Sequence, residues 1–420
     1  FSSAQEVTGN LWRRTKGDKV IWAIVILLTM VSILVVYSSI GSLAYRMNKS
    51  TESYLFRQVG YICLGVIIIY FAHRVNYTIY SRVASILFII SVPLLLYTLK
   101  YGSHINDASR WIKLPVINLT FQTSDLAKLA LFMYMSRLLS RRQNVIKDFK
   151  KGFLPLIIPV GIICILIAPA NLSTALLIGG IALLLMFIGR VQVKHILMVV
   201  GAALIPLIFL VSIAHHYYDQ KEQVSEDLPA LLSFGRMPTW VKRVQDFMYA
   251  DKEDASYQIQ QAKIAIATGG IFGKGPGKSE QRNFLPHPYS DFIYAIIIEE
   301  YGLAGGTVIL LIYLLFLFRS IRLFQRCPYA FGAFLAVALS FTLVIQALVN
   351  MAVNVNLFPT TGVTLPLVSM GGSSLLFTCF SIGIILSVAR NVEDAEGKSA
   401  LLATQQTEEA VNDEGENNES

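Results

Sequence analysis

Long apolar stretches dominate the chain and recur along almost its whole length. A membrane-spanning helix needs about 20 predominantly apolar residues. Seven uncharged stretches of roughly that size are 20–40, 83–99, 152–168, 172–189, 196–214, 328–353 and 365–389. Three more carry charged residues: 53–72 with Arg57, 117–136 with Asp125 and Lys128, and 292–318 with Glu299 and Glu300. The pattern predicts an all-α polytopic membrane protein with about ten transmembrane helices.

Lysine and arginine are distributed unequally among the short segments that join these helices. With the N-terminus placed in the cytoplasm, the inner segments carry 19 of these residues and the outer ones 6. Cytoplasmic segments are enriched in lysine and arginine, so both termini are expected in the cytoplasm. This gives a cytoplasmic N-terminal segment at 1–19 and a membrane domain at 20–390. Residues 391–420 hold nine acidic residues and one lysine, and they are predicted to form a disordered acidic tail.

One connection, at 215–291, is far longer than the roughly 2–8 residues usual between packed helices. The charge bias places it on the outer face of the membrane. It contains the aromatic residues Trp240, Phe247, Tyr249, Phe272 and Phe284. Disordered segments are poor in aromatic residues, so this large outer loop is expected to be folded.

The composition excludes several classes of protein. The chain of 420 residues is 54% hydrophobic and 15% charged, with a mean hydropathy of +0.56. Soluble domains carry about 25% charged residues, so neither an ordinary cytosolic enzyme nor a disordered protein fits. The four cysteines form no CxxC pair, which argues against a disulfide framework or a zinc site.

A glycine-rich basic segment lies within the outer loop. It consists of Gly269, Gly270, Gly273, Gly275 and Gly277 with Lys274 and Lys278. Exposed backbone amides beside ammonium groups suit a phosphate or pyrophosphate. The GxxxxGK[ST] spacing of an ATP-binding loop does not occur, and ATP is scarce outside the membrane. The alternative is a flexible surface loop, because glycine-rich matches are weak signals.

Asp291 stands where the outer loop re-enters the membrane. Partial desolvation raises the pKa of a carboxylate toward the range of a general base. The alternative is an aspartate that caps the next helix. Glu299 and Glu300 lie two turns deeper, where ionisable groups are usually functional or paired. His287, near the same rim, is either a proton carrier or structural.

Asp125 and Lys128 are spaced to share one helix face. Mutual neutralisation lowers the cost of burying both charges, so we predict a structural ion pair. Arg110 and Trp111, just before this helix, are placed to meet a lipid headgroup phosphate. Farther along, asparagines, prolines and glycines interrupt the apolar region at 350–374. Broken helices at membrane depth occur where they line a cavity or pack on protein. Either a polar groove between helices or a transporter-like discontinuous site is expected there.

Eight stretches along the chain, in order, resemble the motifs of the SEDS family (shape, elongation, division and sporulation) of bacterial membrane proteins, the group of FtsW and RodA. The resemblance covers roughly 18–392. The stretches are SRWIKL (109–114), QTSDLAK (122–128), PANLSTA (169–175), YQ (257–258), AIATGGIFGKG (265–275), FLPHPYSDFIYA (284–295), EEYG (299–302) and LPLVSMGGSS (365–374).

This chain departs from the family pattern at several positions. The family's Pro-Glu-x-His reads Pro286, His287, Pro288 and Tyr289 here, so a role for that glutamate or histidine does not transfer. Asn171 replaces the mid-chain aspartate, and Asp125 replaces the first glutamate. The family's essential aspartate falls on Asp291, which is kept.

The resemblance implies polymerisation of peptidoglycan glycan strands from lipid II, with Asp291 as general base and undecaprenyl pyrophosphate as leaving group. Positive charge for the pyrophosphate is expected from Lys274, Lys278, Arg243 or a divalent cation, magnesium or manganese. Arg110, Gly273, Gly275 and Ser373 complete the predicted substrate-binding set. The implied partners are a class B penicillin-binding protein and other division membrane proteins, and no nucleic acid.

The resemblance leaves two other functions open. One is a lipid II flippase, and the other is a non-catalytic scaffold that recruits a transpeptidase. The chemically useful groups cluster at the outer face, whereas a flippase needs polar groups through the full bilayer depth, and this favours the enzyme. The N-terminal segment and acidic tail favour the division type over the elongation type, in the bacterial inner membrane at the septum.

Overall fold

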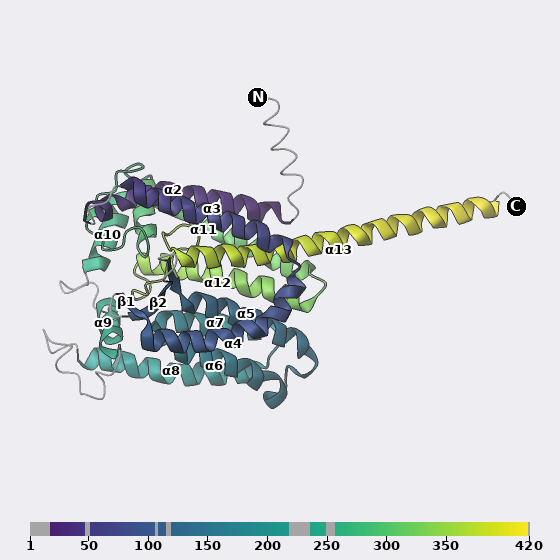
Figure 1. Ribbon diagram of the computed structural model, residues 1–420, viewed down its shortest axis with the longest axis horizontal. Coiled ribbons are helices and arrows are strands. Elements are labelled where there is room, and N and C mark those ends of the chain that lie inside the picture. The colour runs from purple at the N-terminus through teal and green to yellow at the C-terminus, as the bar shows by residue number, and fades with distance from the viewer. Residues whose placement is uncertain are drawn as a thin grey trace, which may run out of the picture.

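The computed structural model describes residues 17–46, 51–105, 108–114, 119–217, 236–248 and 257–418. Its long helices lie side by side in one bundle (Figure 1). They are α2 (Lys19–Arg46), α3 (Thr51–Arg74), α4 (Tyr77–Tyr101), α5 (Thr123–Arg141), α6 (Leu154–Ile167), α7 (Leu172–Ile188), α8 (Val193–His216), α11 (Ile293–Arg326), α12 (Ala330–Asn354) and α13 (Ser373–Asn418).

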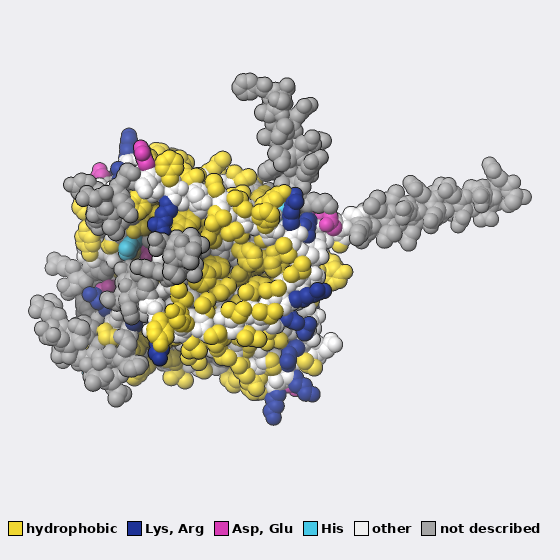
Figure 2. Space-filling view, in the orientation of Figure 1, with side chains coloured by type: hydrophobic (Ala, Val, Ile, Leu, Met, Phe, Trp, Pro, Cys, Tyr) yellow, Lys and Arg dark blue, Asp and Glu magenta, His cyan; other side chains and the backbone are white. Residues whose placement is uncertain are grey.

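Each of the ten predicted apolar stretches overlaps one of these helices, and the chain is a multi-pass helical membrane protein. Among the described residues, eight helices are long and apolar enough to cross a membrane. The other two are α5, which carries Asp125 and Lys128, and α7, which has 17 residues. The number of crossings therefore stays a prediction. Figure 2 shows the broad apolar surface between a cluster of lysines and arginines at one end and mixed charges at the other.

The helices differ in how deeply they sit in the bundle. In the membrane-crossing windows, 78% of the residues of α12 and 72% of those of α13 are buried, against 11% for α8. The buried face of α12 includes the small residues Ala336, Ala338 and Ala347, and small side chains allow helices in a membrane to approach closely. Helices α12 and α13 therefore form the centre, and α8 lies at the edge.

A small antiparallel sheet corrects the predicted start of one helix. Strands β1 (Ser103–Ile105), β2 (Ala108–Leu114) and β3 (Leu119–Gln122) form a sheet in the order β1-β2-β3. The helix predicted at 117–136 therefore begins at Thr123. Leu119, Thr120, Phe121 and Gln122 alternate apolar and polar, which suits a strand with two different faces, and the apolar window had merged this alternation with the helix.

Two more predicted boundaries are wrong. The apolar stretch at 365–389 becomes helical only at Ser373, because Pro366 cannot donate a helical hydrogen bond and Gly372 has a φ of 52°. The tail, predicted to be disordered, continues α13 as helix to Asn418 and projects away from the bundle (Figure 1). Its alanines, glutamates, glutamines and leucines have high helix propensity, so acidic composition alone does not exclude a helix.

The described part of the predicted outer loop is folded at the end of the bundle that carries the sheet (Figure 1). Helix α9 (Met237–Met248) packs on α8, and α10 (Tyr257–Gly269) packs on α11. A 3₁₀ turn, η3 (Gln281–Asn283), precedes the segment that carries Asp291. This end therefore holds most of the polar groups that the sequence singled out.

Candidate functional site

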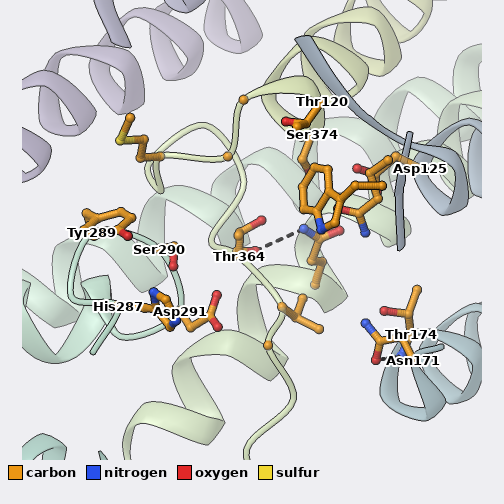
Figure 3. A pocket seen from close by; sticks show the side chains of 18 of the residues that line it. Thr120, Asp125, Asn171, Thr174, His287, Tyr289, Ser290, Asp291, Thr364 and Ser374 are labelled. Atoms are coloured by element: carbon orange, nitrogen blue, oxygen red, sulfur yellow. Dashed lines mark hydrogen bonds between the residues drawn. The ribbon is translucent and has the colours of Figure 1, made fainter. Parts of the chain in front are cut away.

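A polar cavity of about 650 Å³ lies at this end of the bundle. In Figure 3, His287 and Asp291 lie on one side of it, Asp125 and Thr120 on the facing side, and Asn171 and Thr174 on a third. Its basic side chains are Arg57, Lys128, Arg236 and Arg243, and its carboxylates are Asp125 and Asp291. We call it the cationic cavity, because the basic groups outnumber the acidic ones among the described residues that line it.

Side chains that donate to main-chain carbonyls hold the backbone of Asp291 in the wall of this cavity. Its carbonyl oxygen accepts from the side-chain amides of Asn350 and Asn354, both at 2.9 Å. The preceding carbonyl, of Ser290, accepts from the Ser369 hydroxyl at 2.6 Å. The asparagines that predicted a polar groove thus fix the backbone around Asp291 and leave its side chain directed to the cavity.

Glu299 anchors the other end of the same segment. This fully buried carboxylate accepts from the Ser279 hydroxyl, from the amide of Glu280 at 3.1 Å and from that of Gln281 at 3.3 Å. The Lys274 ammonium donates to it at 3.0 Å, and this hydrogen bond raises the pKa of Lys274. The buried negative charge is therefore compensated, and 279–281 is tied to the first turns of α11.

Glu300 is bonded through one oxygen, Oε1, while its Oε2 has no hydrogen-bond partner among the described residues. Its carboxylate accepts from the Ser38 hydroxyl of α2 and from the amide of Ser279 at 3.4 Å. Arg282 donates to the Ser38 carbonyl at 2.8 Å. Both glutamates therefore join the loop to the bundle.

The glycine-rich segment is part of this anchor, and its predicted binding of a phosphate stays a prediction. The amides of Lys274 and Gly275 donate to the carbonyls of Glu299 and Glu300, each at 2.9 Å. These amides are therefore already used within the protein. None of Gly273, Lys274, Gly275 and Lys278 is among the residues that line the cationic cavity. Backbone pairing between distant segments cannot be read from glycine spacing.

The same segment stabilises a kink in α11. At Gly302, φ is 71° and ψ is −176°, which interrupts the helix. The amides of Leu303 and Ala304 donate to the carbonyls of Gly270 and Ile271, at 2.9 and 3.1 Å. Amides freed by the kink thus find partners in the glycine-rich segment, as buried backbone groups require.

Gly273→Ala is expected to destabilise the protein far more than Gly277→Ala. Both glycines have positive φ, 79° and 75°, so both variants incur a backbone cost of about 1–2 kcal/mol. A Cβ at Gly273 would overlap the Glu300 carbonyl, whereas nothing lies within 4 Å of a Cβ at Gly277. Thermal unfolding of the two purified variants measures the difference, and equal unfolding temperatures would contradict the proposed anchor.

Arginines from separate segments supply the positive charge of the cavity. Arg243 of α9 belongs to the predicted substrate-binding set. Among the cations of that set whose side chains the structure describes, it alone lines the cationic cavity. Burial lowers the pKa of Arg243, and the neighbouring Arg236 lowers it further, whereas Asp291 acts in the opposite direction. Arg57 lies with its guanidinium 5.7 Å from the ring centroid of Tyr61. Arg236 and Arg57 were not predicted; the only signal was that Arg57 interrupts an apolar stretch.

The predicted ion pair is present, and it also borders the cavity. Lys128 Nζ lies 3.3 Å from Asp125 Oδ1 and donates to Gln346 Oε1 at 3.0 Å. Asp125 is buried. The pair is therefore positioned both to hold α5 against α12 and to contact a molecule in the cavity.

Strand β3 separates the cationic cavity from an apolar groove of about 520 Å³. Thr120 and Gln122 line the cavity, whereas Phe121, on the opposite face of the strand, lines the groove and packs on Phe377 at 5.5 Å between ring centroids. The other groove residues include Ile67, Ile68, Phe71, Tyr80 and Phe380. A polar and an apolar site thus lie one strand apart.

The predicted substrate-binding residue Ser373 faces the apolar groove instead of the cationic cavity. Ser373 lines the groove, and its hydroxyl accepts from the Gln122 amide at 3.3 Å, while the adjacent Ser374 lines the cavity. The helical repeat of α13 rather than the sequence motif decides which serine faces the polar side. Arg110 belongs to β2, but its side chain lies outside the described part of the chain. Within the described ranges, no three His, Cys, Asp or Glu side chains cluster to hold a metal ion.

The fold and site define a multi-pass membrane protein with a cationic cavity beside an apolar groove at one membrane face. Residues 18–394 match the family of cell cycle proteins that comprises FtsW, RodA and SpoVE, and the chain belongs to this family. It is 34% identical to the probable peptidoglycan glycosyltransferase FtsW of Geobacter sp. (strain M18), over 91% of this chain and 100% of that protein. It is 30% identical to stage V sporulation protein E of Bacillus subtilis (strain 168), over 90% and 98%.

Solved structures share the fold. The rod shape determining protein RodA of Thermus thermophilus matches with a TM-score of 0.60 and 22% identity, over 89% of this chain and 97% of that one. A chain from a peptidoglycan synthase complex, described as coordinating polymerization and crosslinking, matches with a TM-score of 0.68 and 22% identity, over 90% and 98%. The predicted family and helical membrane fold are confirmed.

Proposed function

We propose that this chain is a peptidoglycan glycosyltransferase that polymerises lipid II into glycan strands. The observation that carries the proposal is the position of Asp291 in the wall of a cavity lined by four basic side chains. The names of the FtsW relatives support the same activity. A lipid-linked pyrophosphate substrate needs such a site at the membrane, because its lipid stays in the bilayer while its headgroup reacts outside.

Asp291 is assigned as the general base. It takes the proton of the acceptor's 4-hydroxyl, whose oxygen bonds to the donor's anomeric carbon as the bond to the pyrophosphate oxygen breaks. Undecaprenyl pyrophosphate then leaves, and Arg57, Arg236 and Arg243 stabilise its charge. A magnesium or manganese ion would bind together with the substrate pyrophosphate, since magnesium commonly binds one or two carboxylates and substrate phosphates.

The apolar groove is assigned to the prenyl chain. Strand β3 and the first residues of α13 place the groove directly beside the cavity, so that a headgroup and its lipid can be held together. The apolar lining and its aromatic rings match a branched hydrocarbon chain.

We also propose a location in the cell and partner proteins for this chain. The relatives named FtsW support a role in the inner membrane at the division septum, with both termini in the cytoplasm. The synthase complex among the structural matches supports a class B penicillin-binding protein as partner, together with other division membrane proteins.

The experiment that tests the proposal is polymerisation of fluorescent lipid II by the purified full-length chain. The chain is assayed alone and with its cognate transpeptidase, and products are separated by gel electrophoresis. Glycan strands of many disaccharides are expected. Their absence under both conditions would refute the glycosyltransferase and leave the flippase or the scaffold.

The membrane face on which the cavity lies distinguishes the proposed polymerase from a flippase. Cysteines introduced singly at the exposed positions Lys278 and Lys147, after replacement of Cys63, Cys164, Cys327 and Cys379, report which membrane face each occupies. A membrane-impermeant thiol reagent, applied to cells with a permeabilised outer membrane, is expected to label position 278 and spare position 147. Labelling of 147 alone would place the cavity in the cytoplasm, where the polymer cannot be made.

A further inference from the structure

A second cavity, of about 600 Å³, adjoins the cationic cavity at Asp291. It shares Arg243, Gln258, Asp291, Gly362 and Val363 with the cationic cavity. The residues that line only this second cavity are Thr239, Lys242, Asp246, Tyr257, Pro286, Phe292, Val353, Thr360 and Thr361. We call it the threonine-lined cavity. Asp291 therefore lines both chambers, within reach of a molecule in either.

The two chambers differ in chemistry. Apart from the shared side chains, the described lining of the cationic cavity adds the cations Arg57, Lys128 and Arg236 with one carboxylate, Asp125. The threonine-lined cavity adds one cation, Lys242, and one carboxylate, Asp246. The first is thus suited to a pyrophosphate and the second is close to neutral.

The second chamber also carries the groups that recognise sugars. Three threonine hydroxyls and the phenol of Tyr257 line it. Hydroxyl groups donate and accept hydrogen bonds, as a sugar's hydroxyl and acetamido groups do. Pro286 and Phe292 add apolar surface of the kind that packs against a sugar ring. These side chains come from α9, α10 and the segments before α11 and α13, so the chamber is assembled only when the outer loop folds against the segment before α13.

We infer that the threonine-lined cavity is the acceptor site, which binds the N-acetylated sugar whose hydroxyl attacks, and that the cationic cavity is the donor site. This inference rests on the proposed function, and it assigns a different substrate to each chamber. In a direct displacement, the nucleophile and the leaving group lie on opposite sides of the reacting carbon. The acceptor oxygen enters from one chamber, its proton passes to Asp291, and the pyrophosphate leaves into the other.

The test uses one substrate for each site. A lipid II analogue without the acceptor 4-hydroxyl can only donate, and one whose anomeric oxygen is replaced by methylene can only accept. Together they give a single coupled product, and the KM for each is measured with the full-length chain and its transpeptidase. Ordinary lipid II is polymerised in parallel, so that loss of this reaction in the wild type would refute the proposed function itself.

Thr361→Val and Tyr257→Phe are expected to raise the KM for the acceptor about 3- to 10-fold, as for a lost neutral hydrogen bond, with the donor KM unchanged. Arg236→Gln is expected to raise the donor KM about 10- to 100-fold, as for a lost charged one. Thr268→Val, on the exposed face of α10 and lining neither cavity, is the matched control. With ordinary lipid II still polymerised, an unchanged acceptor KM in both the Thr361 and Tyr257 variants, or an equal rise for the donor, would overturn the assignment.

Discussion

Asp291→Asn is expected to reduce glycan polymerisation at least about 100-fold, the usual contribution of a general base. The amide keeps the size of the side chain but cannot accept the proton. Folding should be preserved, because the substitution keeps the size of the side chain and leaves in place the hydrogen bonds from Asn350 and Asn354 to the carbonyl of residue 291. The measurement is the initial rate with fluorescent lipid II, beside the thermal unfolding temperature of the same preparation.

Each alternative outcome of this experiment has a definite meaning. A variant that polymerises at nearly the wild-type rate would remove Asp291 from the role of base. A variant with an unchanged unfolding temperature but no product supports it. Asp291→Glu is the companion variant, since it restores a carboxylate at a shifted position and is expected to recover part of the rate.

Lys128→Ala is expected to destabilise the protein by about 3–5 kcal/mol, the cost of leaving one charge of a buried pair alone. Asp125 Oδ1 loses its contact with the ammonium group, and Oδ2 has no hydrogen-bond partner among the described residues. Asp125→Asn combined with Lys128→Met should restore part of the stability, because no charge then remains buried. Thermal unfolding in detergent measures all three proteins.

The position of Lys128 in the cavity wall gives this variant a second possible outcome. If Lys128→Ala unfolds at the wild-type temperature but makes no glycan, the lysine acts on the substrate rather than on the fold. The structural role predicted from the sequence would then be wrong.

The membrane fold was predictable because about 20 apolar residues are the physical requirement for crossing a bilayer. Each predicted stretch overlaps a helix for that reason. The errors fall where an apolar segment is not helical, at β3 and before Ser373. Apolar composition alone does not distinguish a strand or a proline-broken loop from a helix, and only the alternation at 119–122 carried a signal.

The candidate site was predictable only in part. The position of Asp291 beside the membrane followed from the sequence, and Arg243 followed from its place in the outer loop. Arg57 and Arg236 come from segments far apart in the chain, and only the folded bundle brings them together. The contacts of the glycine-rich segment could not be predicted, because its amides donate to the carbonyls of Glu299 and Glu300 and its carbonyls accept from the amides that follow Gly302. Both sets of hydrogen bonds depend on tertiary structure.

The length of α13 has a consequence for the other side of the membrane. At about 1.5 Å per residue, its 46 residues form a rod of about 70 Å, more than twice the roughly 30 Å hydrocarbon core. The outer half of this rod stands clear of the bundle (Figure 1). Because the rod is continuous with a buried central helix whose first turn lines the cavity, one unbroken helix joins the cavity wall to a point well beyond the opposite end of the bundle.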